Sequence, residues 1–179
     1  GAEVIKLEHP EAQDPARELG VLYGDSKDTT LFLGANRNKL GMALDLSTPM
    51  GRDVFYRLVK TADVVAINLR PDVSSRLGLD YKALRGIKED LIYCIFTAFG
   101  EHLPYRTKSG TDTVIQAMGG IMYLTGEEGD PPIRVGTAIA DIAGSLYAAF
   151  GIMAALYHKK TAGEGQQVSI SLLEALIGL

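Results

Sequence analysis

The sequence is poor in cysteine, basic runs and histidine clusters. It has a single cysteine, Cys94, so an intrachain disulfide is excluded and a reducing compartment is expected. Lys and Arg occur at most in pairs, and the formal net charge is −4, so a nucleic-acid partner is not predicted. The three histidines, His9, His102 and His158, are scattered without metal-ligand spacing. No metal site is therefore predicted, although a small anionic ligand needs only a few local cations.

Long apolar segments and targeting signals are also scarce. An apolar stretch over residues 142–157 is shorter than the ~20 residues needed to cross a bilayer, and it contains two glycines. We therefore expect a buried helix and no membrane partner. No basic segment with an apolar core and a cleavage site opens the chain, so secretion is not indicated. A cytoplasmic location is expected, or a mitochondrial or peroxisomal one in a eukaryote.

The remaining composition is that of a soluble globular domain. Hydrophobic residues make up 46% of the chain and charged residues 22%. Short β-branched runs bounded by polar residues predict buried strands at residues 2–8, 62–68 and 90–98. A length of 179 residues is enough for one domain with a real core.

Helical patterns separate these predicted strands. Residues 47–62 have Ser47 or Thr48 as N-cap, Pro49 in the first turn and apolar side chains at helical spacing. A second, shorter helix is expected at about residues 79–87. Alternating strands and helices are typical of parallel sheets, so the predicted fold class is α/β, with an open, Rossmann-like parallel sheet and crossover helices.

The second half of the chain changes character. Residues 99–136 are rich in Gly, Pro and charge, and such loops commonly lie over the carboxyl ends of parallel strands, where open sheets bind ligands. A long helix is predicted at about 140–160, followed by a strand at 166–171 and the start of another helix.

Asp141 is the only formal charge between Arg134 and His158, in otherwise apolar surroundings. One interpretation is an N-cap, because Asp is favoured there and the helix is expected to begin at this residue. The other is a carboxylate nucleophile, held ionised by backbone N–H groups and the helix dipole while apolar walls exclude water. Both interpretations can hold at once.

Several cations have a surface interpretation and a ligand-binding one. Arg37 and Lys39 precede a strand-like segment, where they are either solvated or close to a phosphate. Asn68 ends a buried strand, and Arg70 and Arg76 follow it, which is the usual ligand-binding position of an open sheet.

Glu8 and Cys94 are the remaining candidates. Glu8 lies where the ribose-binding acid of a dinucleotide fold would lie, but no GxGxxG motif occurs in the chain. A nicotinamide-dependent dehydrogenase would need that motif upstream of Gly1. Cys94 lies in the apolar run LIYCIF without a neighbouring cation, so it is interpreted as a core thiol.

Four segments taken together carry a family resemblance along the whole chain. They are GAEVIKLE, NRNKLGMALDLSTPMGRDVFYRLVKTADVVAINLRPDVSSRLGLDYKAL, LIYCIFTAFG, and RVGTAIADIAGSLYAAFGIMAALYHKKTAGEGQQVSISLLEA. In this order they resemble the family III CoA-transferases of the CaiB/BaiF type. That family includes formyl-CoA transferase, carnitine CoA-transferases and the related α-methylacyl-CoA racemases.

The resemblance implies a role for Asp141 as the catalytic nucleophile. Its carboxylate would attack an acyl-CoA thioester to give a mixed anhydride, and the released CoA thiolate would then form an aspartyl-CoA thioester. The substrates would be an acyl-CoA and a small carboxylic acid, with no tightly bound cofactor. Activated acyl groups hydrolyse in water, which agrees with the apolar surroundings of Asp141.

The resemblance also implies contacts with coenzyme A. These positions are His9; Leu44, Asp45, Leu46 and Ser47; Asn68, Leu69 and Arg70; Arg76; and Ser109, Gly110, Thr111 and Asp112.

Three positions depart from the family pattern. His9 replaces a frequent Arg near the nucleotide, so a titrating group stands in for a permanent cation. Thr111 stands where many transferases have Tyr and the racemases have a His base, which disfavours racemase chemistry, although His102 is near in sequence. Leu103 interrupts a loop that usually contains glycine, which leaves the acyl substrate open.

The family fold has a large α/β domain joined to a smaller one, and two chains thread through each other as interlocked rings. By this resemblance residues 1–179 are expected to be a partial domain, without the first strand and the C-terminal half. An acyl-CoA racemase and a non-catalytic CoA-binding fragment are the alternatives to a transferase.

Overall fold

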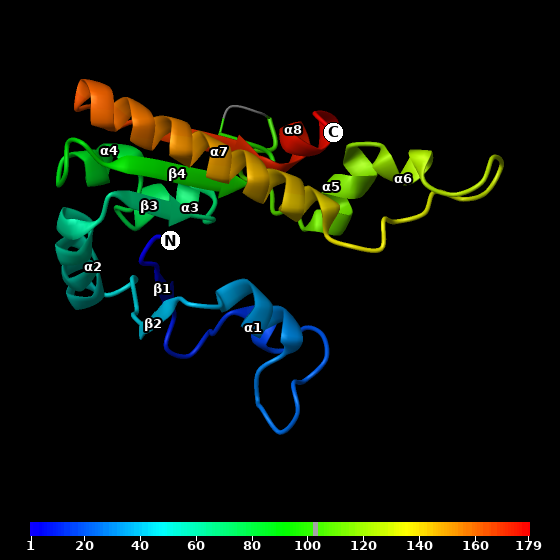
Figure 1. Ribbon diagram of the computed structural model, residues 1–179, viewed down its shortest axis with the longest axis horizontal. Helices are drawn as coiled ribbons and strands as arrows, with labels where there is room; N and C mark the ends of the chain where they lie inside the picture. Colours follow the sequence, from blue (N-terminus) through cyan, green and yellow to red (C-terminus); the bar gives the residue numbers. More distant parts are fainter. Residues whose placement is uncertain (102–103) are drawn as a thin grey trace. The chain divides into compact units, whose positions relative to one another are not determined.

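A computed structural model describes residues 1–101 and 104–179 of the chain (Figure 1). His102 and Leu103, with the predictions made for them, lie outside the described residues. The chain divides into two compact units, Gly1–Phe55 and Tyr56–Leu179. Each unit has its own parallel sheet, of two and three strands respectively, which confirms the predicted α/β class.

The first unit is built on a pair of parallel strands. Strand β1 (Ile5–Glu8) pairs with β2 (Leu40–Ala43), so that Glu8 lies opposite Ala43. The crossover between them contains a 3-10 turn, η1 (Pro15–Arg17), and helix α1 (Thr30–Asn36). Thr29 is the N-cap of α1: its hydroxyl accepts a hydrogen bond from the N–H of Phe32 and donates one to the carbonyl of Ala16. This one side chain therefore ties the helix to the 3-10 turn.

Charged side chains lock the same crossover onto β1. The Arg17 guanidinium donates hydrogen bonds to both carboxylate oxygens of Glu8, at 3.1 and 3.0 Å, and to Asp28 at 2.6 Å. It also lies 3.8 Å from the ring centroid of Phe32. Arg17 is the main reason that the pKa of Glu8 falls from 4.5 to about 2. With both oxygens engaged, Glu8 is not available to a ribose, so the dinucleotide interpretation is not supported.

The lowered pKa of Glu8 predicts a specific acid sensitivity. A carboxyl whose pKa is lowered by folding stabilises the fold above its unfolded pKa, here 4.5, and this stability disappears as the pH falls towards about 2. We therefore expect Glu8→Gln to lower the free energy of unfolding by about 2–3 kcal/mol at pH 7. Urea unfolding at a series of pH values measures this loss, which should vanish near pH 2. Glu3→Gln, at an exposed position, is the control; equal stability of the two variants at pH 7 would contradict the role of Glu8.

The second unit contains a three-stranded parallel sheet in the order β3-β4-β5 (Figure 1). The strands are β3 (Val64–Ile67), β4 (Ile92–Thr97) and β5 (Gln167–Ser171). The chain enters by α2 (Pro49–Thr61), whose first turn is capped by the Thr48 hydroxyl, as predicted. The other helices are α3 (Pro71–Arg76), α4 (Tyr81–Arg85), α5 (Asp112–Met118), α6 (Ile121–Leu124), α7 (Ile139–Ala162) and α8 (Leu172–Ile177).

Helix α7 packs closely on the sheet because two of its residues have no side chain. A Cβ atom on Gly144 would lie 2.6 Å from Leu172 Cδ2 and 2.8 Å from Phe96 Cε2. A Cβ atom on Gly151 would lie 2.7 Å from Val168 Cγ1. These glycines and the buried alanines near them form the face that contacts the sheet.

The opposite face of α7 is apolar and exposed, which corrects the expectation of a buried helix, whereas its predicted extent of about 140–160 is confirmed. The helix has 24 residues, and over its most apolar 18-residue window the mean hydropathy is 1.7 while only 22% of the window is buried. Length and composition alone would let it cross a bilayer. The glycine-containing face of the same helix packs against side chains of the sheet. The outer face of α7 consists of Ile142, Leu146, Phe150, Met153 and Tyr157.

Candidate active site

Asp141 lies in the first turn of α7 and is half-buried. The helix begins at Ile139 with Ala138 as N-cap, so the prediction that Asp141 caps the helix is wrong. The cap comes from another helix. Asp112, the first residue of α5, accepts hydrogen bonds at Oδ1 from the N–H of Ala140 at 2.8 Å and from the N–H of Asp141 at 3.4 Å. A carboxylate at a helix N-terminus is favourable, and this one is supplied from 28 and 29 residues earlier in the chain.

Among the residues that the structure describes, this arrangement leaves the carboxylate of Asp141 without a stabilising partner. Burial, and after it the nearby charge of Asp112, raise the pKa of Asp141. Within residues 1–101 and 104–179, no protein group donates a hydrogen bond to its side chain. The expectation that backbone N–H groups hold it ionised is therefore wrong, because those groups bond to Asp112. A poorly solvated carboxylate with few donors is a better nucleophile than a surface one.

Gln116 supports this capping arrangement and was missed in the sequence. Its side chain is fully buried, at 0% exposure. Its amide nitrogen donates to Asp112 Oδ2 at 2.6 Å and to the carbonyl of Thr137 at 3.1 Å, and its amide oxygen accepts from the N–H of Val135 at 2.9 Å. The available signal was a polar residue at helical spacing within the apolar segment VIQAM.

The predicted residues of this unit gather at the carboxyl edge of its sheet. Asn68, Leu69 and Arg70 directly follow β3. Gly110 lies against the residues after β4, since a Cβ atom there would be 2.8 Å from Ala98 Cβ. Arg70 Nη1 donates to the carbonyl of Thr107 at 2.9 Å, which links the two segments. This edge is where open parallel sheets bind ligands.

Other members of the predicted set are accessible from solvent. Thr111 is the N-cap residue of α5, but its hydroxyl makes no capping hydrogen bond, and the residue is exposed. Ser109 is exposed as well, and Arg76 is the exposed last residue of α3.

In the first unit, the predicted residues again follow the strands of a parallel sheet. His9 comes directly after β1, and the segment 44–47 comes directly after β2. The His9 Nε2 lies 3.6 Å from Asp45 Oδ1, and its Nδ1 accepts hydrogen bonds from the N–H groups of Glu11 and Ala12. Two backbone N–H groups thus fix the orientation of the His9 ring, with Nε2 directed toward Asp45. A shallow hollow lies beside it, lined by Glu8, His9, Pro10, Gln13, Arg17, Gly41, Met42 and Ala43.

The positions of the remaining candidates favour their structural interpretations. Arg37 and Lys39 lie between α1 and the amino end of β2, away from the edge that follows the strands. Cys94 is buried in β4, and burial raises the pKa of its thiol to about 11, as expected of a core residue. His158 is exposed near the end of α7, with Nε2 3.7 Å from Glu164.

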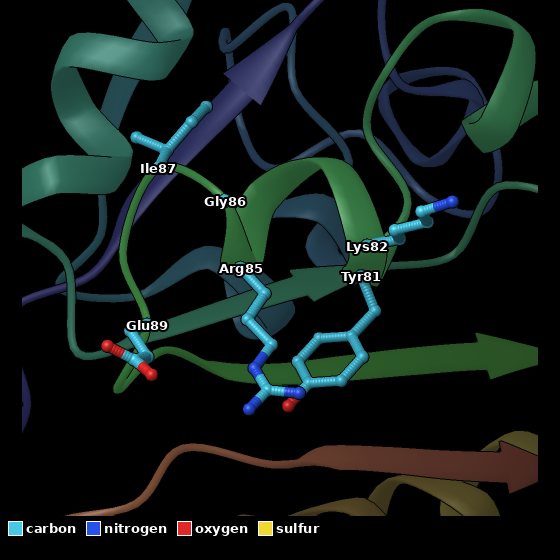
Figure 2. Close-up of a pocket in the computed structure, with 6 residues that line it drawn as sticks. All are labelled: Tyr81, Lys82, Arg85, Gly86, Ile87 and Glu89. Atoms are coloured by element: carbon cyan, nitrogen blue, oxygen red, sulfur yellow. The ribbon is translucent and has the colours of Figure 1, made fainter.

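A second surface hollow lies around α4 (Figure 2). It is lined by Tyr81, Lys82, Arg85, Gly86, Ile87 and Glu89. Figure 2 shows the side chains of Tyr81 and Arg85 next to one another, with Lys82 directed away from them. The residues that line this hollow come before β4 in the chain, and none of them belongs to the predicted site.

Comparison with known proteins decides the family. The model of CoA-transferase family III matches residues 1–179, which is the entire chain. The chain belongs to CoA-transferase family III. Among curated members of this family, the succinate–glutarate CoA-transferase of Agrobacterium fabrum is 41% identical, over 97% of this chain and 45% of that protein. The acetyl-CoA:oxalate CoA-transferase of Acetobacter aceti is 37% identical, over 99% of this chain and 45% of that protein.

Solved structures agree with this membership. A CaiB/BaiF family protein from Brucella suis matches with a TM-score of 0.95 and 40% identity, over 100% of this chain and 48% of that one. A protein from Mycobacterium tuberculosis matches with a TM-score of 0.90 and 31% identity, over 99% and 49%. The chain therefore spans about half the length of these family III proteins.

Proposed function

We propose that the full-length protein containing this chain transfers coenzyme A from an acyl-CoA thioester to a carboxylic acid, with Asp141 as nucleophile. The observation that carries the proposal is the Asp141 carboxylate, which is half-buried and has a raised pKa; the adjacent Ala140 packs in one cluster with Phe99, which follows β4. A carboxylate without hydrogen-bond donors is suited to attack a thioester rather than to stabilise a fold.

The proposed reaction runs through two activated forms of Asp141. A carboxylate oxygen attacks the thioester carbonyl and expels CoA thiolate, which leaves a mixed anhydride. The thiolate attacks the aspartyl carbonyl and releases the donor acid, which gives an aspartyl-CoA thioester. The acceptor carboxylate then displaces CoA to form a second anhydride. Attack of the thiolate on the acceptor acyl group yields the new acyl-CoA and regenerates Asp141.

Coenzyme A contacts are proposed at both sets of residues that follow the strands. In the second unit these are Asn68, Arg70 and the segment 109–112; the Arg70–Thr107 hydrogen bond and the Asp112–Asp141 hydrogen bond support this proposal. In the first unit His9 and the segment 44–47, which follow β1 and β2, are the proposed contacts. The guanidinium of Arg70 is 43% exposed and pairs with Asp72 at 3.3 Å, and it is the cation proposed to meet a phosphate or a carboxylate.

Small dicarboxylic acids are the proposed acceptors, because relatives are named for glutarate, oxalate and malate. The test is to incubate the full-length protein with succinyl-CoA and each acid, and to identify the acyl-CoA products by mass spectrometry. New acyl-CoA formed at the expense of succinyl-CoA is expected with at least one acid, and consumption without transfer to any acid would contradict the proposal. A racemase would instead exchange the α-hydrogen of an acyl-CoA with deuterated water.

An interlocked homodimer is proposed as the assembly, supported by the outer face of α7 and by the family resemblance. Phe150 lies in the middle of this face and is 74% exposed. Burial against a second copy of the chain would explain why the outer face of α7 carries large apolar side chains.

A charge in the outer face of α7 is expected to prevent assembly. Phe150→Asp should reduce the dimer fraction of the full-length protein at least about 100-fold relative to Thr161→Asp, since a buried, unpaired carboxylate costs several kcal/mol. Light scattering after size-exclusion chromatography measures the mass. Dimers of equal stability in both variants would show that this face contacts the same chain rather than a second copy.

A further inference from the structure

The start of α7 is held by a buried polar side chain on α5. Asp141 lies in the first turn of α7. Its carboxylate can keep one position only if the backbone that leads into the helix is also fixed. The segment 135–137 leads into this turn, and Gln116 binds it at both ends, through the N–H of Val135 and the carbonyl of Thr137.

The hydrogen bonds of Gln116 define one orientation of its amide. Its nitrogen faces two acceptors, the Asp112 carboxylate and the Thr137 carbonyl, and its oxygen faces a donor. A flipped amide would place the oxygen against both acceptors. All three bonds are therefore made at once, within a side chain that solvent does not reach.

Asp112 transmits this constraint to Asp141. One oxygen of Asp112 accepts from Gln116, and the other accepts from the N–H groups of Ala140 and Asp141. The residues beside this chain of hydrogen bonds belong to one apolar cluster: Ile115 of α5 packs with Ala140 of α7 and Leu172 of α8. Hydrogen bonds and apolar contacts thus both join α5 to the start of α7.

We propose that Gln116 is a positioning residue of the transferase site, which holds Asp112 and the segment 135–137 so that the Asp141 carboxylate points at the thioester. This inference rests on the proposed function, because Gln116 acts only through Asp141. Gln116 touches no substrate in this scheme. Its loss should therefore slow the formation of the anhydride and leave the binding of coenzyme A largely unchanged.

The test compares two buried substitutions in the full-length protein. Gln116→Met keeps the length of the side chain and removes its hydrogen bonds. Leu84→Ala removes a fully buried side chain of α4, by the amino ends of the strands, and reports the effect of lost stability alone. Steady-state kinetics should show kcat at least 10-fold lower for Gln116→Met, with KM for acyl-CoA within threefold of the unmodified protein. At a matched folded fraction, Leu84→Ala should leave kcat unchanged.

Hydrogen exchange supplies a readout that does not depend on activity. The amides of residues 134–141 should exchange at least 10-fold faster in Gln116→Met than in Leu84→Ala. An unchanged kcat, an equal fall of kcat in both variants, or equal exchange of this segment would overturn the inference. If the unmodified protein transfers no coenzyme A, the proposed function fails, and the exchange comparison still decides whether Gln116 holds the segment.

Discussion

Replacing Asp141 with Ala is expected to lower the rate of CoA transfer by the full-length protein at least about 10³-fold. The methyl group cannot form the anhydride or the aspartyl-CoA thioester, and among the described residues no second carboxylate except Asp112 lies beside it. Asp112 is committed to the backbone of α7 and to Gln116. Affinity for acyl-CoA should change little, because the contacts proposed for coenzyme A lie on other residues. Turnover and equilibrium binding, measured on the same preparation, separate the two effects.

Stability provides the control for this prediction. The raised pKa of Asp141 means that folding disfavours its charged form, so its contribution is favourable only below its unfolded pKa and is lost as the pH rises through the folded value. Asp141→Asn should therefore melt at a higher temperature than the unmodified protein at pH 7, and the gain should disappear in acid. Asp130→Asn, in an exposed loop, is the matched control. CoA transfer at an unchanged rate in Asp141→Ala would show that Asp141 is not the nucleophile.

Replacing Gly51 with Ala is expected to lower the stability of the first unit strongly. A Cβ atom at this position would lie 1.9 Å from the carbonyl oxygen of Asp45, far inside van der Waals contact. The obstacle is backbone, so it cannot rotate away, and the segment 44–47 must move. We expect a loss of about 3 kcal/mol in the free energy of unfolding. Because that segment is a proposed coenzyme A contact, affinity for acyl-CoA should fall as well.

Gly34→Ala is the matched control for Gly51→Ala. It makes the same substitution in helix α1, where a new Cβ atom meets nothing within 4 Å. The higher helix propensity of Ala should stabilise this variant by up to about 1 kcal/mol. Urea unfolding should thus give shifts of opposite sign. A Gly51→Ala protein as stable as Gly34→Ala would contradict the close packing of α2 against the segment 44–47.

Local sequence rules predicted the elements whose signals are local. The strands β1, β3, β4 and β5 follow from short β-branched runs, and the start of α2 follows from Thr48 and Pro49. The importance of Asp141 also follows from its apolar surroundings. The cap of α7 could not be predicted from neighbouring residues. The capping carboxylate belongs to Asp112, and this contact forms only in the tertiary structure.

The errors concerning α7 and Gln116 have the same origin. An apolar run tells how a helix partitions between water and protein, but it does not tell which of its faces is covered within one chain. The glycine face of α7 contacts the sheet, and the larger side chains remain outside. Gln116 was missed because a buried amide is recognised by its partners, and two of its three partners lie 19 and 21 residues away.

Isotope transfer to Asp141 is the most direct test of the proposed mechanism. The full-length protein would be incubated with acyl-CoA and an acceptor acid labelled with ¹⁸O in its carboxylate, and the peptide that contains Asp141 would be weighed by mass spectrometry. When the acceptor carboxylate attacks the aspartyl-CoA thioester, its oxygen becomes the bridge of the anhydride and stays on Asp141 after CoA leaves with the acyl group. The mechanism therefore predicts ¹⁸O in the Asp141 carboxylate after turnover. Complete turnover with no label in that peptide would contradict it.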